Sequence, residues 1–227
     1  MSPEIKMISL QMPLKMGTVN CSLVETDTGY ILIDTGSSNA RTDLEGALES
    51  AGCRPGNLKL IVITHGDFDH IGNAAALREK FGAKIAMHAA DSGMAERGDM
   101  FSNRKKANFL TRMMAPVISA LFGFGRSKRF KPELYIGEGD VLAEYGLDAQ
   151  VLYIPGHSQG SIGILTSGGD LFCGDLLENI EKPSLGSIMD DLAAAHASVE
   201  KLKSLEIDTV YPGHGQPFPM EGFFGKL

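Results

Sequence analysis

The chain has 227 residues, of which 43% are hydrophobic, so its length and composition fit one large domain with a sizeable core. The formal net charge of −7 argues against nucleic acid as a general partner, and no apolar stretch reaches the roughly 18 residues expected of a membrane-spanning helix. Residues 1–16 lack the apolar run of a signal peptide and the three cysteines are not closely spaced, so we expect a cytoplasmic protein without a disulfide framework.

Along the chain, short runs of β-branched residues are separated by segments with helical periodicity. The helical segments are Asn39–Ala51, Ile71–Phe81 and Met189–Leu205. The runs that predict strands are Val19–Glu25, Tyr30–Asp34, Leu60–Thr64, Lys84–His88, Gln150–Ile154, Ser161–Thr166, Asp170–Cys173 and Thr209–Tyr211. Strands before and after each helix predict an α/β fold with two sheets inside and helices outside, which is a four-layer αββα sandwich.

Potential metal ligands gather directly after the apolar run at residues 60–63. His65 and Asp67 are two residues apart, so in an extended loop their side chains point the same way. Asp69 and His70 are adjacent, so their side chains diverge, and one cluster can serve two metals. A ligand cluster at the end of a strand is held on a rigid edge.

Three further candidates lie in turn-like, glycine-containing settings. They are His157 in Pro-Gly-His-Ser, Asp175 in Cys-Gly-Asp, and His214 in Pro-Gly-His-Gly. Imidazole nitrogen and carboxylate oxygen are ligands of divalent ions. Seven such residues at strand ends and turns indicate a dinuclear metal site.

These motifs, with Ile31-Leu32-Ile33-Asp34-Thr35-Gly36 before them, resemble the metallo-β-lactamase superfamily in type and order. The resemblance implies that site one uses His65, Asp67 and His157, that site two uses Asp69, His70 and His214, and that Asp175 bridges them. It also implies that Asp34 supports the ligand loops. The family's usual cluster is His-x-His-x-Asp-His, and here Asp67 stands at the second histidine.

We therefore expect two divalent metal ions per chain, zinc or iron/manganese. The carboxylate of Asp67 is a harder ligand than imidazole and shifts the preference of site one towards iron or manganese. If Asp67 instead turns away, one metal remains, held by Asp69, His70, Asp175 and His214.

The resemblance implies a metal-dependent hydrolase that acts on a small-molecule ester, thioester, lactone or phosphodiester through a metal-bridging hydroxide. Asp69 would orient or deprotonate the nucleophile while it ligates site two. Two alternatives stay open. One is a di-iron redox protein like the flavodiiron proteins, whose cluster is His-x-Glu-x-Asp-His. The other is a non-catalytic metal-binding sensor.

We expect one metallo-β-lactamase-like domain over residues 1–227, with an inserted segment at about 91–131. Arg104 to Lys131 holds eight basic residues and no acidic one, and Phe109–Phe124 is mostly apolar, which predicts a helix there. The segment fits a packed insertion or homodimer interface, a lid over the metals, or, less favoured, a helix on a membrane surface. His88 and His196 match no ligand position of the family, and we expect them to be packed or solvated.

Overall fold

The computed structural model describes residues 3–104, 113–114 and 129–224, and its strands form two main sheets. The first sheet has the strand order β1-β2-β3-β4-β5-β6, and the second has the order β13-β12-β9-β8-β7. The strands of the first sheet are β1 (Ile5–Gln11), β2 (Thr18–Thr26), β3 (Gly29–Ile33), β4 (Leu58–Ile63), β5 (Lys84–Met87) and β6 (Leu134–Tyr135). The strands of the second sheet are β7 (Ala149–Tyr153), β8 (Ile162–Thr166), β9 (Asp170–Gly174), β12 (Thr209–Pro212) and β13 (Phe218–Pro219).

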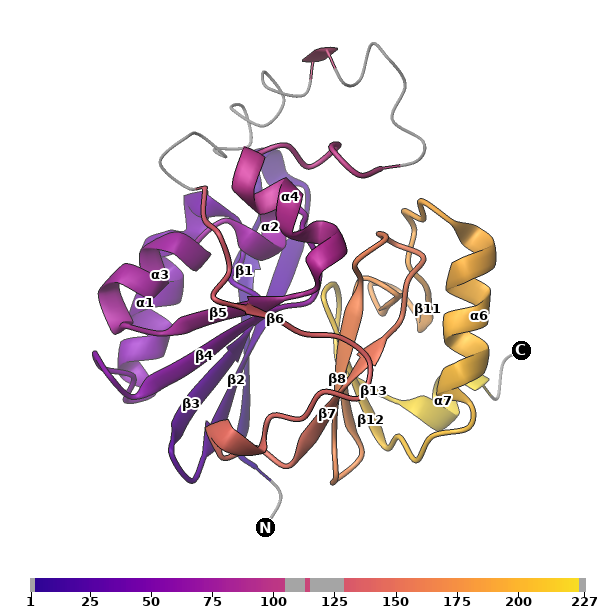
Figure 1. Cartoon of the computed structure of the whole chain (residues 1–227). Coiled ribbons are helices and arrows are strands. Elements are labelled where there is room, and N and C mark those ends of the chain that lie inside the picture. The colour runs from indigo at the N-terminus through magenta and orange to yellow at the C-terminus, as the bar shows by residue number, and fades with distance from the viewer. Residues whose placement is uncertain (1–2, 105–112, 115–128, 225–227) are drawn as a thin grey trace.

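Helices cover the outer face of each sheet, and the two sheets face each other (Figure 1). On the first sheet lie α1 (Arg41–Ser50), α2 (Phe68–Ile71), α3 (Ala74–Phe81) and α4 (Ala89–Arg97). On the second lie α6 (Leu192–Leu202) and α7 (Met220–Phe224), and a short ribbon of β10 (Leu177–Glu178) with β11 (Ser184–Leu185) lies near them. The short 3-10 turns are η1 (Pro13–Lys15), η2 (Ser38–Ala40) and η4 (Ala143–Tyr145).

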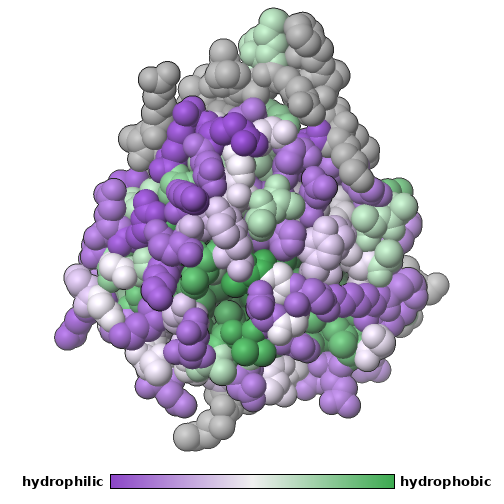
Figure 2. All heavy atoms as spheres, in the orientation of Figure 1, coloured by the Kyte–Doolittle hydropathy of each residue, from purple (hydrophilic) through white to green (hydrophobic). Residues whose placement is uncertain are grey.

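The hydrophobic core explains this layering, because β4 is buried on both faces. Ile61 and Ile63 pack in the cluster under α1 and α3, whereas Leu60 and Val62 pack against the second sheet, where they meet side chains such as Phe172. A third cluster joins the second sheet to α6 and α7. Three apolar layers between four structural layers confirm the predicted αββα sandwich. Figure 2 shows that most of one outer face is hydrophilic, with hydrophobic side chains gathered near its middle.

Parallel pairing places several strand ends at one edge of the molecule. In the first sheet β3, β4, β5 and β6 are parallel, and in the second β9 and β12 are parallel. The loops that follow the carboxyl ends of parallel strands meet at that edge, which is where a ligand site forms in α/β sheets.

One local prediction needs correction. The helix expected over 71–81 is two helices, α2 and α3, because the chain breaks at Gly72 and Asn73. A Cβ atom on Gly72 would lie 2.6 Å from the carbonyl oxygen of Gly36, and Asn73 donates hydrogen bonds to the backbone carbonyls of Thr35 and Ser37 at 2.7 and 3.0 Å. The loop after β3 thus docks where a continuous helix would run. As a result, the first of the two helices, α2, already begins at Phe68, with Asp67 as its N-cap.

The sequence patterns did not predict β1 and α4, nor the short elements β6, β10, β11, β13 and α7. The strand β1 pairs antiparallel with β2 at the edge of the sheet, and its alternating burial is typical of a strand with one face in solvent. The helix α4 has His88 as its N-cap, whose Nδ1 accepts the N–H of Ala90, and Gly98 in the left-handed conformation as its C-cap. This helix occupies the first part of the range expected for the insertion, and the apolar helix expected at 109–124 lies outside the described residues except for Met113 and Met114.

Candidate metal centre

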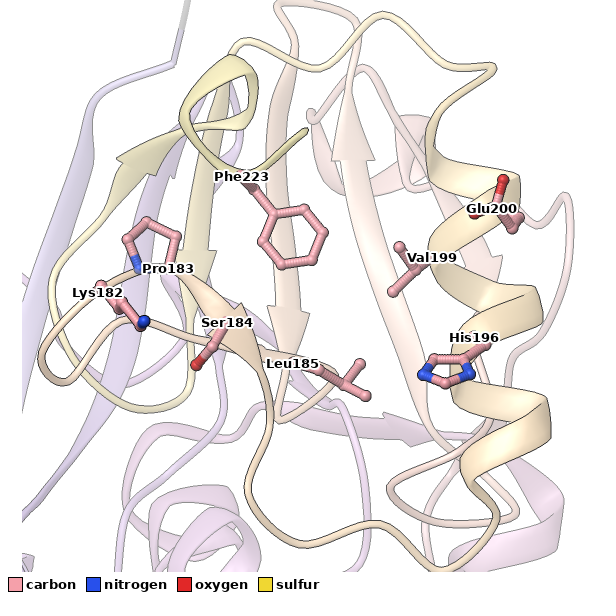
Figure 3. A pocket seen from close by; sticks show the side chains of 8 residues that line it. All are labelled: Lys182, Pro183, Ser184, Leu185, His196, Val199, Glu200 and Phe223. Carbon is pink, nitrogen blue, oxygen red and sulfur yellow. The ribbon is translucent and has the colours of Figure 1, made fainter. Parts of the chain in front are cut away.

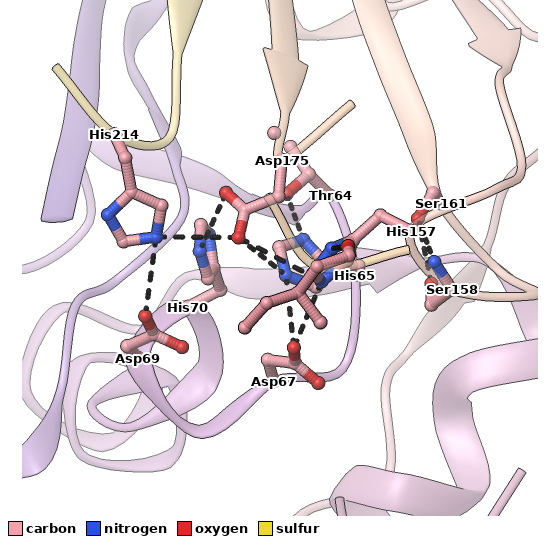
Figure 4. A network of polar contacts seen from close by, with 12 residues as sticks. Thr64, His65, Asp67, Asp69, His70, His157, Ser158, Ser161, Asp175 and His214 are labelled. Carbon is pink, nitrogen blue, oxygen red and sulfur yellow. Dashed lines mark hydrogen bonds and ion pairs between the residues drawn. The ribbon is translucent and has the colours of Figure 1, made fainter. Parts of the chain in front are cut away.

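All seven predicted ligands converge at the edge where the strand ends meet (Figure 4). Four of them, at positions 65, 67, 69 and 70, follow β4, and the last two of these lie on α2. His157 lies in the loop between β7 and β8, Asp175 directly follows β9, and His214 follows β12. The two sheets therefore both contribute side chains to one site.

The four imidazoles present the same ring nitrogen to the centre. In each of them Nδ1 has a partner in the protein: His65 with the hydroxyl of Thr64 at 3.0 Å, and His157 with the carbonyl of Ile188 at 2.7 Å. The remaining two pairs are His70 with the Asp34 carboxyl at 2.8 Å and His214 with the carbonyl of Thr18 at 2.7 Å. Partners on Nδ1 fix the ring orientation and leave Nε2 as the ligand atom.

The carboxyl group of Asp175 lies between these rings. Its Oδ1 is 3.3 Å from Nε2 of His70, and its Oδ2 is 3.4 Å from His214, 3.7 Å from His65 and 3.8 Å from His157. One carboxyl group that approaches all four imidazoles has the position expected of a bridging ligand between two metals.

The side chains form two groups of metal-ligand type around this carboxyl. His65, His157 and Asp175 make the first group, and Asp69, His70 and His214 make the second. In the second group Asp69 Oδ2 is 3.5 Å from Nε2 of the histidine at 214. These groups match the two predicted sites except at position 67.

One carboxylate oxygen of Asp67 faces the histidines of the centre, and the other faces the guanidinium of Arg104. Its Oδ2 lies 3.0 Å from Nε2 of His157 and 3.8 Å from Nε2 of His65. Its Oδ1 accepts a hydrogen bond from Nη2 of Arg104 at 2.5 Å. Burial disfavours the charged carboxylate, but Arg104 and then His157 outweigh it and lower the pKa of Asp67. Asp67 has therefore not turned away from the site.

The carboxyl groups give the centre a strong affinity for positive charge. Burial alone would lower the pKa of His214, but Asp175 raises it to about 10. Burial likewise opposes protonation of His70, yet Asp175 and Asp34 raise its pKa well above the ordinary value. Burial holds the pKa of His65 well below the ordinary value. Protons or metal ions thus compete for the same ring nitrogens.

A bound metal fits the donor atoms present. Among the described residues, Nε2 of His65, Nε2 of His70 and Oδ1 of Asp175 are buried without a hydrogen-bond partner. Buried polar atoms normally have partners, and a divalent ion would satisfy these three. A set of imidazole nitrogens and carboxylate oxygens suits zinc, iron or manganese.

Asp34 supports the ligand loops, as the family resemblance implied. Its Oδ1 accepts the N–H of Thr64 at 2.9 Å, and its Oδ2 accepts the Thr64 hydroxyl at 2.8 Å in addition to contacting His70. Asp34 itself adopts a φ of 59°, in the left-handed region. The side chain thereby ties the loop after β3 to the loop after β4 and to α2.

Two supporting residues were missed. Asp91, at the start of α4, is fully buried and joins the two ligand loops: its Oδ2 accepts the N–H of Gly66 at 2.9 Å and the hydroxyl of Ser158 at 2.6 Å. Its Oδ1 accepts the N–H of Gly160 at 2.8 Å and the side-chain amide of Asn103 at 2.7 Å. The other missed residue is the arginine at 104, described above. Neither belongs to a local motif, because their partners lie far away in the sequence.

The family model of the Metallo-beta-lactamase superfamily matches residues 14–214, a range that holds all seven candidate ligands. The chain belongs to this superfamily.

Relatives within the superfamily agree with the predicted class of activity. Hydroxyacylglutathione hydrolase GloC of Haemophilus influenzae is 29% identical over 161 residues, which are 70% of this chain and 66%, just under two thirds, of that protein. Acyl-coenzyme A thioesterase MBLAC2 of Bos taurus is 28% identical over 223 residues, covering 90% of this chain and 76% of that protein. The solved structure of TTHA1623 in a di-iron-bound form is 28% identical, covers 97% of each chain and gives a TM-score of 0.72. These relatives support a metal-dependent hydrolase in general terms, and the metallo-β-lactamase fold is confirmed.

Other sequence predictions concern regions away from the metal centre. His88 stacks on Tyr153 with ring centroids 4.9 Å apart, and His196 lines a separate cavity of about 350 Å³ between β11, α6 and α7 (Figure 3). None of the seven candidate ligands lines that cavity. Within the described parts of the chain, no helix has the length and apolar character needed to cross a membrane.

Proposed function

We propose that this metallo-β-lactamase superfamily member is a dinuclear metal-dependent hydrolase of acyl thioesters. The observation that carries the proposal is the convergence of four imidazole Nε2 atoms on Asp175, with every Nδ1 held by the protein. Such a centre is preorganised, so metal binding needs little rearrangement of the protein.

When bound, divalent metals supply a water of lowered pKa as nucleophile and polarise the scissile carbonyl. The protein side chains then set the geometry. Asp175 holds the two ligand groups at a fixed separation, and His70 is oriented by Asp34. Asp69, buried on α2, would accept a hydrogen bond or a proton from the nucleophilic water.

Exposed apolar side chains beside the ligands support a substrate with an apolar acyl group. Ile188, 69% exposed, has the carbonyl that holds His157. Ile180 is 68% exposed and directly follows Asn179, whose backbone N–H donates to the carbonyl of His214. We infer that these two side chains contact the apolar acyl group of the substrate. The thioesterase and hydroxyacylglutathione hydrolase names of two relatives point to the same bond type.

The test is a substrate panel measured with metal-loaded protein. It contains acyl-CoA thioesters of increasing chain length, a hydroxyacylglutathione, a nitrophenyl ester, a lactone and a nitrophenyl phosphodiester. We expect thioesters to react fastest, with a preference for longer acyl chains. Asp175→Ala and His70→Ala should lose about 10² or more in rate. His196→Ala, remote from the centre, is the matched control and should keep the wild-type rate. A faster phosphodiester reaction would refute the thioester assignment.

Two observations favour a second candidate, a di-iron redox protein. TTHA1623 has been solved in a di-iron-bound form, and Asp67 places a carboxylate where the flavodiiron cluster has one. Oxygen consumption by the iron-loaded protein with a flavin electron donor, in the absence of thioester turnover, would favour this candidate.

A further inference from the structure

Arg104 places a guanidinium group inside the metal centre. The residue is only 9% exposed, and its Nη2 lies 2.5 Å from Oδ1 of Asp67 and 3.3 Å from Nε2 of His157. Its Nη1 donates to the backbone carbonyl of His157. The planar guanidinium thus binds Asp67 and His157 together, a geometry that the point charge of a lysine does not reproduce.

The loop that carries Arg104 is anchored independently of this contact. Asn103, directly before it in the chain, donates to the carbonyl of Ala90 at 2.8 Å and to Asp91 at 2.7 Å. Arg104 therefore reaches Asp67, 37 residues earlier in the chain, from a fixed position beside α4.

An opposite charge accompanies the carboxylate at position 67. A histidine there would be a neutral ligand, whereas Asp67 adds one negative charge beside His65 and His157. Arg104 adds one positive charge on the same carboxyl group, so the charges of this pair cancel. Asp91 and Asp190 also act on the Arg104 guanidinium and, together with Asp67, raise its pKa.

The position of Arg104 also affects a metal at the first ligand group. A metal bound to Nε2 of His157 at about 2.1 Å would lie at most about 5.4 Å from Nη2 of Arg104, given the 3.3 Å between Nη2 and Nε2. Two cations this close in a buried site repel each other strongly. In the second ligand group, Nε2 of His214 lies 3.5 Å from Asp69 and 3.4 Å from Asp175, and the described part of the chain places no arginine in ion-pair contact with it.

We propose that Arg104 is a positioning residue that neutralises Asp67, directs its Oδ2 to the metal centre, and makes the group of His65, Asp67 and His157 the weaker of two metal sites. This inference rests on the proposed metal centre. It predicts that the chain fills in order, with the Asp69, His70 and His214 group occupied first.

The test is equilibrium dialysis of the full chain against graded free Zn²⁺, and against Fe²⁺ without oxygen, with metal per chain measured by mass spectrometry. We expect two binding steps in the wild type that differ by at least about tenfold in affinity. In Arg104→Gln the weaker step should tighten by at least about tenfold, because Asp67 keeps its full charge for the metal, while the tighter step stays unchanged. Arg97→Gln, an exposed arginine on α4, is the control and should leave both steps as in the wild type.

A second pair of variants covers the case in which Arg104→Gln does not fold. Asp67→His alone leaves Arg104 without its carboxylate and should bind the second metal more weakly than the wild type. The double variant Asp67→His with Arg104→Gln should recover two tight zinc sites, so the two changes should be strongly non-additive. Additive effects in this cycle would overturn the proposal.

The binding data distinguish a wrong role for Arg104 from a wrong proposed function. Two equal steps in the wild type, unchanged by Arg104→Gln, would overturn the role of Arg104 while the hydrolase stands. A wild-type chain that binds no metal would overturn the metal centre itself, and the role of Arg104 with it.

Discussion

Asp91 is the side chain whose removal tests the support of the metal centre most sharply. It is fully buried and accepts four hydrogen bonds, from Gly66, Ser158, Gly160 and Asn103. The substitution Asp91→Asn keeps the shape of the side chain and replaces one acceptor oxygen by an NH₂ donor.

Either orientation of the new amide creates a conflict. If its nitrogen replaces Oδ2, it faces the N–H of Gly66, although the Ser158 hydroxyl can turn to accept. If its nitrogen replaces Oδ1, it faces both the N–H of Gly160 and the amide of Asn103. At least one buried donor is left unsatisfied in each case, at about 1–3 kcal/mol, and one hydrogen bond of about 1 kcal/mol is lost.

We therefore expect the free energy of unfolding to fall by about 2–4 kcal/mol, which for a chain of this size lowers Tm by roughly 5–15 °C. Because the chain has no tryptophan, unfolding of the metal-free protein in urea is best followed by circular dichroism or tyrosine fluorescence. Metal affinity should fall as well, because Gly66 directly follows His65 and Gly160 lies in the same loop as His157.

The control is Asp99→Asn. Asp99 is half-buried and accepts the N–H of Phe101 at 2.9 Å within its own turn, so its loss should cost under about 1 kcal/mol. If Asp91→Asn unfolds within about 0.5 kcal/mol of the wild type, Asp91 does not join the ligand loops in the way described.

Three further predictions concern the metal centre itself. In Gly213→Ala the new Cβ would collide with Oδ1 of Asp175 and lie 2.8 Å from Cε1 of His70. We therefore expect calorimetric titration to show loss of metal binding, while the circular dichroism spectrum stays native. Asp34→Asn weakens the contact with Nδ1 of His70, so metal affinity should fall about 10- to 100-fold. Competition with a chromophoric chelator measures this affinity, and an unchanged value would refute the supporting role of Asp34. Metal affinity should rise with pH, because the pKa values of His70 and His214 are raised and a metal must displace their protons. Proton release on addition of zinc in weak buffer checks this, and a metal affinity that does not change with pH would contradict it.

The sequence predicted the layers and the gathering of the seven candidate ligands because both depend on local patterns, to which the family resemblance added the assignment to two sites. The strand at 60–63 is apolar on both faces, as a strand between two packed layers must be, and the ligands follow directly after such strands or lie in glycine turns. The break at Gly72 could not be read from helical periodicity, since it arises from the close approach of a distant loop. Arg104 and Asp91 were missed for the same reason: their function comes from partners brought together only by the fold. The edge strand β1 has the expected alternation but few buried residues, which makes its pattern weak.

The most direct test of the central claim is thioester turnover measured against metal occupancy in one series of samples. Protein stripped by chelator receives increasing amounts of divalent metal, and each sample is analysed for metal per chain and for thiol release from an acyl-CoA. We predict no turnover in the stripped protein, a rate that rises with occupancy towards two metals per chain, and no recovery in Asp175→Ala. Turnover that persists in stripped protein, or its absence from fully loaded protein with every substrate in the panel, would contradict a metal-dependent hydrolase.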